Sequence, residues 1–272
     1  MSRARRARAR RQDLVGSIVI AMLAIAAAAG GTWWWRHNGS EARDAIGCLE
    51  SADYDRLSIL VDRSDALTPL QKRGVRQWVE MAVDDAAPGT RITLHALEPD
   101  HPLLVQTLFD GCRPPDGTSA NRLTQNERRL RTRWREEFEK PLQTLLEATL
   151  EDASASTSPL LEAIQSVAVQ DFSTFRTPDR LRRLLIVSDM LQHTAGYSHY
   201  RDDPLDYAGF ASLPYARGVR ASLDNVDVEI AYVGRTQHAE RQTIAHGLFW
   251  EGHVEANGGR LQSIRRVTGG PS

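Results

Sequence analysis

An uncharged apolar run near the N-terminus most strongly limits what this chain can fold into. Residues 14–35 form a stretch of 22 residues without a charged side chain. As a helix this stretch would rise roughly 33 Å, enough to cross the hydrocarbon core of a bilayer. Three consecutive tryptophans close the run, and indole rings favour the interface between lipid and water. The pattern predicts a transmembrane helix at residues 14–35.

Positive charge lies almost entirely on the N-terminal side of this run, where six arginines precede it. Basic residues beside a first span stay in the cytoplasm, so we expect a cytoplasmic N-terminus and an extracytoplasmic, periplasmic C-terminal part. A cleaved signal peptide is the alternative, because a basic start, an apolar stretch and the small residues at 26–31 also suit signal peptidase. The predicted order is an Arg-rich tail at 1–13, the transmembrane helix, a connector at 36–55 and a globular domain at 56–272.

The exported part of the chain is net acidic. Residues 1–39 hold seven basic residues and one acidic residue, which leaves 27 basic and 34 acidic residues and a formal charge of −7 for the remainder. A domain of this charge lacks the positive surface that nucleic acids require. We therefore expect no nucleic-acid partner.

Two cysteines, Cys48 and Cys112, fall in the exported part. An oxidising compartment would allow them to form a disulfide, and two buried free thiols are the alternative. Neither cysteine has a close Cys or His neighbour in the sequence, which argues against a zinc site.

Short apolar runs alternate with longer helical patterns through the exported part. Strands are predicted at 56–61, 90–97, 103–109, 184–187, 226–233 and 261–267. Helices are predicted at 68–87, 124–150, 158–169, 207–223 and 238–256. The turn between the second and third strands is too short for a parallel crossover, so these two strands should pair antiparallel. The alternation as a whole predicts an α/β fold.

Several helix starts carry capping signals. Thr68 precedes Pro69 and Gln71, Thr124 precedes Glu127 in a capping box, and Ser158 precedes a proline. The helix at 238–256 should turn His246 and His253 toward solvent.

Oxygen-bearing side chains follow two of the predicted strands and precede a helix. Asp62 and Ser64 follow the first strand, Asp189 closes the fourth, and Ser158 stands before a helix, with Thr68 a further candidate. Ligands of open α/β sheets bind outside the carboxyl ends of the strands, near the point where strand order reverses. A set of oxygen donors alone suits a hard cation such as Mg²⁺.

In these residues the sequence resembles the von Willebrand factor type A fold. The metal-ion-dependent adhesion site of that fold uses Asp-x-Ser-x-Ser after the first strand, a Thr before a helix that is commonly followed by Pro-Leu, and an Asp that closes the fourth strand. Asp62 and Ser64 match the first two ligands, Ser158 stands in place of the Thr, and Asp189 matches the last. The resemblance covers roughly residues 55–257.

The resemblance implies a doubly wound, Rossmann-like sheet that is mostly parallel, with residues 103–109 as its one antiparallel edge strand. It also implies that Mg²⁺ or another divalent cation binds at Asp62, Ser64, Ser158 and Asp189. The third position of the first motif is Ala66, which has no hydroxyl, so the site is degenerate. Thr68 could replace the missing hydroxyl, although helix capping already explains this residue.

The resemblance further implies a non-enzymatic module that binds another protein, with a divalent cation accepting the partner's carboxylate. The aromatic segment 197–207 beside the site reads as a recognition surface or as an ordinary long loop. No nucleophile elbow and no Gly-rich phosphate loop occurs in the sequence. A structural subunit of an envelope assembly with a vestigial site, and a metal-assisted hydrolase, are the alternatives. The short connector places any partner in or close to the same membrane.

Overall fold

The computed structural model divides the chain into two units, residues 1–43 and 44–272, which we describe separately. The residues that it describes are 22, 25, 26, 28–32, 44, 46–48, 54–101, 103–118, 126–151, 155–173, 179–201 and 206–267.

In the first unit, the described residues of the apolar run are helical. The remainder of the predicted span at 14–35, the tail at 1–13 and most of the connector at 36–55 lie outside the described residues. Among the residues that are described, no helix has the length and apolar character to cross a membrane.

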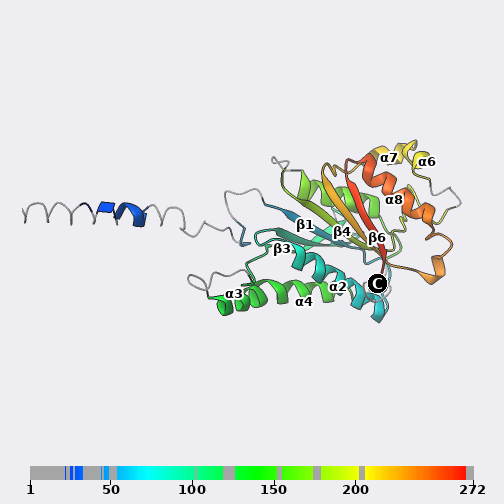
Figure 1. The fold of residues 1–272 in the computed structure, drawn as a ribbon. Helices are drawn as coiled ribbons and strands as arrows, with labels where there is room; N and C mark the ends of the chain where they lie inside the picture. Colours follow the sequence, from blue (N-terminus) through cyan, green and yellow to red (C-terminus); the bar gives the residue numbers. More distant parts are fainter. Residues whose placement is uncertain are drawn as a thin grey trace, which may run out of the picture. The chain divides into compact units, whose positions relative to one another are not determined.

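A six-stranded sheet forms the centre of the second unit (Figure 1). Its strands are β1 (Arg56–Val61), β2 (Arg91–Leu97), β3 (Val105–Cys112), β4 (Arg182–Ser188), β5 (Val226–Tyr232) and β6 (Arg260–Arg266). The strand order is β3-β2-β1-β4-β5-β6, and only the β2–β3 pair is antiparallel. The chain winds outward from β1 in one direction and from β4 in the other, so strand order reverses between these two neighbours. The predicted doubly wound sheet with one antiparallel edge strand is confirmed.

Helices cover both faces of this sheet (Figure 1). They are α2 (Pro69–Asp85), α3 (Glu127–Trp134), α4 (Lys140–Thr149), α5 (Leu160–Val167), α6 (Tyr207–Ala211), α7 (Pro214–Gly218) and α8 (Ile244–Ala256). Alternate β1 side chains enter two separate apolar cores, because successive strand residues point to opposite faces. Leu57 and Ile59 pack with residues of α2 and α4, whereas Leu60 packs with residues of α5 and α8.

The structure confirms the helix cap that the sequence predicts for α2 and shows a different capping residue for α3. Thr68 caps α2 through the predicted capping box with Gln71. Asn126, whose side chain accepts a hydrogen bond from the backbone N–H of Arg129, caps α3. The predicted cap at Thr124 lies outside the described residues. A π-helical turn, Arg135–Glu139, joins α3 to α4, so the helix predicted at 124–150 is made of three segments.

The expected exposure of two histidines on α8 is wrong. His246 and His253 are both buried, with 0% and 1% of their surface exposed. His246 lies 2.6 Å from the Tyr232 hydroxyl, and His253 packs against the rings of Tyr207 and Phe210. The cause is that α8 packs on the sheet with α6 over it, a tertiary arrangement that the helical period alone does not reveal.

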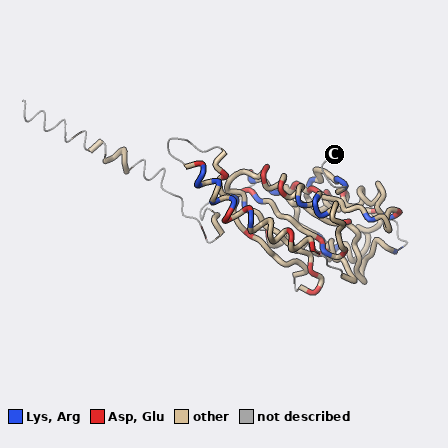
Figure 2. Tube along the Cα trace, turned by 90° about the horizontal axis from the view of Figure 1, so that it is seen from below, with Lys and Arg blue, Asp and Glu red and all other residues tan. Residues whose placement is uncertain are grey.

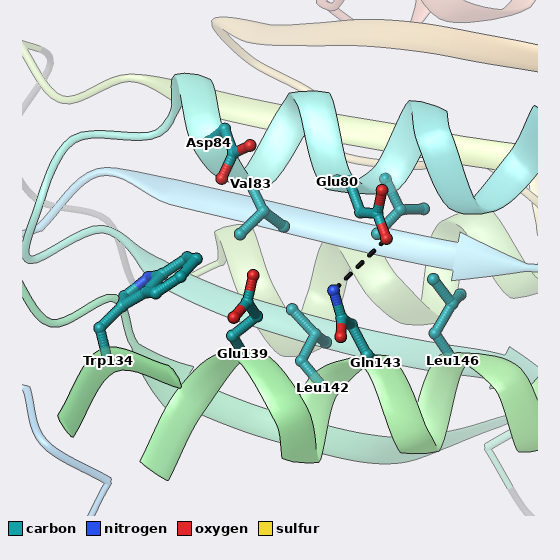
Figure 3. A pocket seen from close by; sticks show the side chains of 9 residues that line it. Glu80, Val83, Asp84, Trp134, Glu139, Leu142, Gln143 and Leu146 are labelled. Carbon is teal, nitrogen blue, oxygen red and sulfur yellow. Dashed lines mark hydrogen bonds between the residues drawn. The ribbon is translucent and has the colours of Figure 1, made fainter. Parts of the chain in front are cut away.

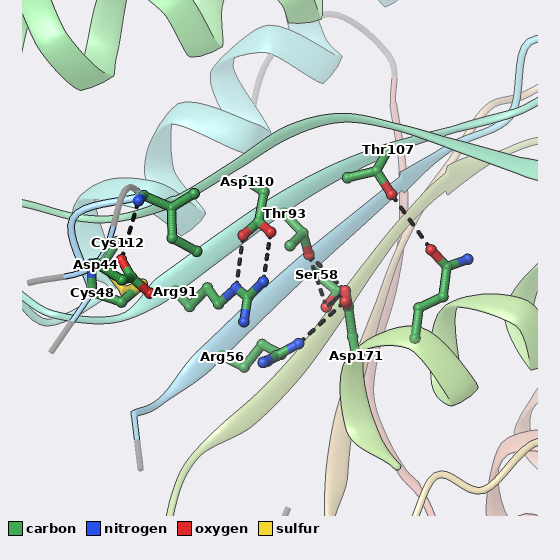
Figure 4. Close-up of polar contacts among 12 residues, drawn as sticks. Asp44, Cys48, Arg56, Ser58, Arg91, Thr93, Thr107, Asp110, Cys112 and Asp171 are labelled. Atoms are coloured by element: carbon green, nitrogen blue, oxygen red, sulfur yellow. Dashed lines mark hydrogen bonds and ion pairs between the residues drawn. A yellow bond between two sulfur atoms is a disulfide. The ribbon is translucent and has the colours of Figure 1, made fainter. Parts of the chain in front are cut away.

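The predicted disulfide is confirmed. Cys48 and Cys112 are bonded, with their Cα atoms 5.0 Å apart and a separation of 64 positions in the sequence (Figure 4). The backbone N–H of Cys112 also donates to the carbonyl of Ile46. The segment at 46–48 is thereby fastened to the last residue of β3.

Charged residues of both signs are interspersed along the helices of this unit (Figure 2). On α3 and α4, and on the turn between them, pairs one helical turn apart join Arg131 to Glu127, Arg133 to Glu137 and Lys140 to Glu136. These pairs mark a solvent-facing surface, which is what the charge pattern predicts.

Candidate functional site

Asp62 is the centre of a buried hydrogen-bonded cluster at the carboxyl end of β1. Its Oδ1 accepts from the backbone N–H of Ser64 at 2.9 Å. Its Oδ2 accepts from the hydroxyls of Ser158 at 3.2 Å and Ser188 at 2.7 Å. All four residues are buried. Three of the four predicted ligands, Asp62, Ser64 and Ser158, therefore lie together.

Asp189, the fourth predicted ligand, follows β4 and is also buried. Its Oδ1 accepts from the backbone N–H of Leu191 and its Oδ2 from Nε of Arg235, each at 3.0 Å. Burial and the nearby charge of Asp62 raise the pKa of Asp189, while the Leu191 hydrogen bond and the Arg235 charge oppose this increase. Two carboxylates thus share this edge of the sheet at the point where strand order reverses.

Arg235, just beyond the carboxyl end of β5, reaches across this edge. Besides binding Asp189, its guanidinium donates through Nη1 to the carbonyl of Ala66 at 2.5 Å and through Nη2 to the carbonyl of Asp65 at 3.1 Å. Only 11% of the Arg235 side chain is exposed. Its three donor atoms join the loop after β1 to the loop after β4.

Gln242 holds Arg235 in place. Its Oε1 accepts from the backbone N–H of Arg235 at 2.6 Å. Its Nε2 donates to the carbonyls of Asp189 at 3.0 Å and Val233 at 2.8 Å. This buried amide therefore fixes the backbone on both sides of the Asp189–Arg235 pair.

The residues present do not fit a divalent cation while Arg235 lies among them. Both oxygens of Asp62 and both oxygens of Asp189 already accept hydrogen bonds from the protein. A guanidinium has no lone pair to offer a metal, and its charge repels one. Within the described part of the chain, no three His, Cys, Asp or Glu side chains form a group that could hold a metal.

Ser158 is not the helix cap that the sequence suggests. Its hydroxyl donates to Asp62, and the N-cap position of α5 is Pro159, which has no capping side chain. Gln192, in the loop after β4, instead accepts from the backbone N–H of Leu161 at 2.9 Å. A cap supplied by a distant loop leaves no signal next to the helix in the sequence.

Thr68 lies outside this cluster. Its hydroxyl accepts from the backbone N–H of Gln71, and the residue is exposed at the start of α2. The capping interpretation of Thr68 is therefore confirmed, and the structure gives no support to its alternative role as a ligand.

The aromatic segment after β4 is only partly a surface loop. Tyr197 and His199 are buried, with 5% and 1% of their surface exposed, whereas Tyr200 is half-buried and Arg201 exposed. Burial, followed by the charges of Asp189 and other nearby acids, raises the pKa of Tyr200 to about 12. Residues 202–205 lie outside the described residues. Among the described residues of this segment, Tyr200, Arg201, Asp206 and Tyr207 keep surface open to solvent.

Three residues of the site were missed in the sequence: Ser188, Arg235 and Gln242. Ser188 immediately precedes Asp189, and a hydroxyl at the end of a strand beside a predicted ligand is a usable signal. Arg235 follows β5, whose carboxyl end must lie beside that of β4, so a basic residue there was also a signal. Gln242 lies seven positions further along the chain, away from any strand end, so its local sequence does not indicate that it belongs to the site.

A second buried polar cluster surrounds Asp171, which lies in the π-helical turn after α5 and contacts residues of β1 and β2 (Figure 4). Its carboxylate lies 2.5 Å from Ser58 Oγ, 2.6 Å from Thr93 Oγ1, 2.8 Å from His95 Nε2 and 3.2 Å from Arg56 Nη1. Burial acts to raise the pKa of Asp171, but the hydrogen bonds outweigh it and lower the pKa to about 2. The cluster joins β1 and β2 to the turn after α5 and is closed to solvent.

A small hollow of about 160 Å³ lies between α2 and α4 (Figure 3). Val83 and Leu142 line its apolar part, and Glu80, Asp84 and Glu139 supply carboxylates. Burial raises the pKa of Glu139, and the negative charges of Asp84 and Glu80 add to this effect against that of a nearby arginine. An apolar floor with an acidic rim distinguishes this hollow from the cluster at the strand ends.

No protein-family model and no curated protein matches this sequence. Among solved structures, the SpRpn10 VWA domain is 12% identical, with 81% of this chain and 91% of that chain covered and a TM-score of 0.37. A von Willebrand factor type A structure from Catenulispora acidiphila is 10% identical, with 79% and 40% covered and a TM-score of 0.39. Proximal thread matrix protein 1 from the mussel byssus, with a zinc-occupied MIDAS motif, is 12% identical, with 75% and 48% covered and a TM-score of 0.38.

The strand order and the single antiparallel edge strand match the expectation stated from the sequence. The fold is von Willebrand factor type A-like. The fold is recognised from the strand order and the single antiparallel edge strand, and the function of the site is inferred from its own geometry. Hereafter residues 44–272 are called the type A-like domain.

Proposed function

We propose that the type A-like domain is a non-enzymatic protein-interaction module that binds its partner at the carboxyl ends of β1, β4 and β5. We call this the strand-end surface. It comprises residues of the converging loops that keep at least part of their surface open to solvent, namely Asp65, Ala66, Ser156, Thr157, His193, Tyr200, Arg201, Arg235 and Thr236.

The observation that carries this proposal is that the loops are fastened to one another. Ser158 and His193 exchange backbone hydrogen bonds at 2.9 Å, and the backbone N–H of Ala155 donates to the carbonyl of Ser64 at 2.9 Å. Nη1 of Arg241 donates to the carbonyl of Arg201 at 3.0 Å. A surface that is already ordered loses little conformational entropy when a partner binds.

The state of the two carboxylates supports a role in binding. A general base has to reach a substrate proton with an accessible oxygen, and both Asp62 and Asp189 are buried. All four carboxylate oxygens of Asp62 and Asp189 instead accept hydrogen bonds from the protein itself. A metal-assisted hydrolase built on these residues therefore finds less support than an interaction module.

The tether is the second part of the proposal. We propose that residues 14–35 hold the domain at the membrane with the N-terminus in the cytoplasm and the domain in the periplasm. The Cys48–Cys112 disulfide supports this, because such bonds persist in oxidising compartments. The partner would then be a protein in or close to the same membrane, and a nucleic acid is not expected.

Site-directed photocrosslinking tests the strand-end surface. A photoreactive residue at Arg201 or Thr236 should form a discrete adduct with a membrane-fraction protein, and the same residue at Asp85 or Asp179, which are also exposed, should not. The adduct should persist in EDTA. A structural subunit packed through other faces would give adducts at Asp85 or Asp179 instead, and that result would contradict the proposal.

Fusion of a reporter enzyme to the C-terminus tests the tether. Alkaline phosphatase, which folds only outside the cytoplasm, should be active and should sediment with membranes. Activity in the soluble periplasmic fraction would show that a signal peptide is cleaved, and an inactive fusion would contradict the orientation.

A further inference from the structure

We propose that the guanidinium of Arg235 is a built-in substitute for a divalent cation, and that removal of its charge would turn the surrounding oxygen donors into a cation site. This inference concerns the chemistry of the site and holds whether or not the proposed protein partner exists.

The charge of the site requires a cation. Asp62 and Asp189 are 8% and 3% exposed, and buried carboxylates of this kind are costly unless a positive charge compensates them. Arg235 supplies that charge, with its Nε 3.0 Å from Asp189 Oδ2. Arg63, in the same loop as Asp62, is paired with Glu98.

The guanidinium contacts the residue at which the motif lacks a hydroxyl. Ala66 stands where the motif has its second hydroxyl, and the carbonyl of this same residue accepts from Nη1 of Arg235 at 2.5 Å. The loop therefore offers the guanidinium a backbone oxygen of the same residue that lacks the hydroxyl. The residue that lacks the metal-binding hydroxyl, Ala66, is thus also a residue that binds the internal cation, Arg235.

The donors that would remain after removal of Arg235 are all oxygen atoms. Asp62 and Asp189 would keep two carboxylates, and Ser158 and Ser188 would offer the hydroxyl oxygens that contact Asp62, with Ser64 next to them in the loop after β1. Carboxylate and hydroxyl oxygens are the donors that Mg²⁺ and Mn²⁺ prefer. The uncompensated negative charge would attract a dication most strongly when Arg235 is replaced by a neutral side chain of similar length.

The test is a titration of the purified full chain with Mn²⁺, followed by the loss of the electron paramagnetic resonance signal of the free ion. The wild-type protein should show no saturable Mn²⁺ binding over the titrated range, whereas Arg235→Met should bind a single ion with a dissociation constant at least about tenfold below the upper end of that range. Arg235→Lys, which keeps the charge, is the matched control and should behave as wild type. Combining Arg235→Met with Asp189→Ala should abolish the gained binding.

Two results would overturn the inference. One is Mn²⁺ binding by the wild-type chain that Asp189→Ala removes. The other is a folded Arg235→Met protein, judged by circular dichroism and cooperative unfolding, that gains no binding. If Arg235→Met does not fold, Arg235→Gln decides the question, because its amide can still donate to the carbonyls of residues 65 and 66. None of these outcomes depends on crosslinking to a partner, so the proposed function can fail or hold independently.

Discussion

At the scale of single residues, Gln242 shows how much the cluster of Asp62, Asp189 and Arg235 depends on one buried amide. It is 3% exposed, and its three hydrogen bonds join Asp189, Val233 and Arg235. The backbone groups that it satisfies come from the loops after β4 and β5. Without this side chain, two carbonyls and one N–H would lose their partners in the interior.

Replacement of Gln242 by Leu should therefore destabilise the domain strongly. Each buried polar group left unsatisfied costs about 1–3 kcal/mol, so we expect the free energy of unfolding to fall by about 2–4 kcal/mol in urea titrations. Gln262→Leu on the exposed edge strand is the control, and surface changes of this kind stay within about 0.5 kcal/mol. Equal losses in the two variants would contradict the role assigned to Gln242.

Three buried histidines make stability depend on pH. Burial lowers the pKa of His199 to about 3 and those of His246 and His253 to about 4, from an ordinary 6.5, and for His199 the charge of His246 adds to this effect. Below pH 6.5 these histidines are protonated in the unfolded chain but stay neutral in the folded chain. The free energy of unfolding therefore falls as pH falls toward 4. The raised pKa of Asp189 has the opposite effect, because this carboxyl takes up its proton more readily in the folded chain and so favours folding as pH falls.

The variant His253→Leu isolates the contribution of one histidine to this pH dependence of the unfolding free energy. Between pH 7 and pH 5 each such histidine should cost about 2 kcal/mol of unfolding free energy. The loss measured by urea titration at the two pH values should therefore be smaller by about 2 kcal/mol in His253→Leu than in wild type. An unchanged difference between the two pH values would show that His253 accepts a proton in the folded state.

The residues of the site differ in how far the sequence could predict them. Asp62, Ser64 and Asp189 lie at strand ends in a recognisable motif, so the local pattern predicted where in the fold these residues lie. Arg235 contacts Asp189 across 46 positions of sequence, a contact that exists only because β5 pairs with β4. His246 shows the same limit, because the packing of α8 decides its burial.

At the scale of elements, helix starts show which local signals are strong. The capping box at Thr68 is complete within four residues, so the sequence predicts it and the structure confirms it. The start of α5 is different, because Gln192 from another loop satisfies its backbone. Strand positions were predicted well for the same reason as Thr68: six short apolar runs bounded by turns describe buried strands without reference to distant residues.

Thr68→Ala should lower the free energy of unfolding by about 1 kcal/mol, because the first turn of α2 loses its side-chain cap. Thr68→Ser keeps the hydroxyl and should stay close to wild type. Urea titration of the two variants provides the measurement. A loss in Thr68→Ser as large as that in Thr68→Ala would show that the methyl group, rather than the cap, matters.

At the scale of the whole molecule, the disulfide closes a long loop of the type A-like domain. Cys48 and Cys112 are 64 positions apart, and β1, α2, β2 and most of β3 lie between them. In the chain-entropy model a loop of this length restricts the unfolded state enough to contribute about 4 kcal/mol. The sequence could suggest the pairing, but the distance between the two residues depends on the position of β3 at the edge of the sheet.

Reduction of this disulfide should lower the free energy of unfolding by about 2–4 kcal/mol. Urea titration with and without a reducing agent measures the loss. The double variant Cys48→Ser, Cys112→Ser should be equally destabilised and insensitive to the reducing agent. Wild-type protein that is unaffected by reduction would contradict the structural role of the bond.

We propose that Arg235, in place of a metal ion, completes the cluster formed by Asp62 and Asp189. The most direct measurement is an NMR spectrum of the wild-type chain with added Mn²⁺, because the paramagnetic ion broadens amide signals close to it. The backbone amides of Ser64 and Leu191, which donate to Asp62 and Asp189, report on the site. We predict that both signals keep their intensity. Selective loss of these two signals at low Mn²⁺ concentration would contradict the account.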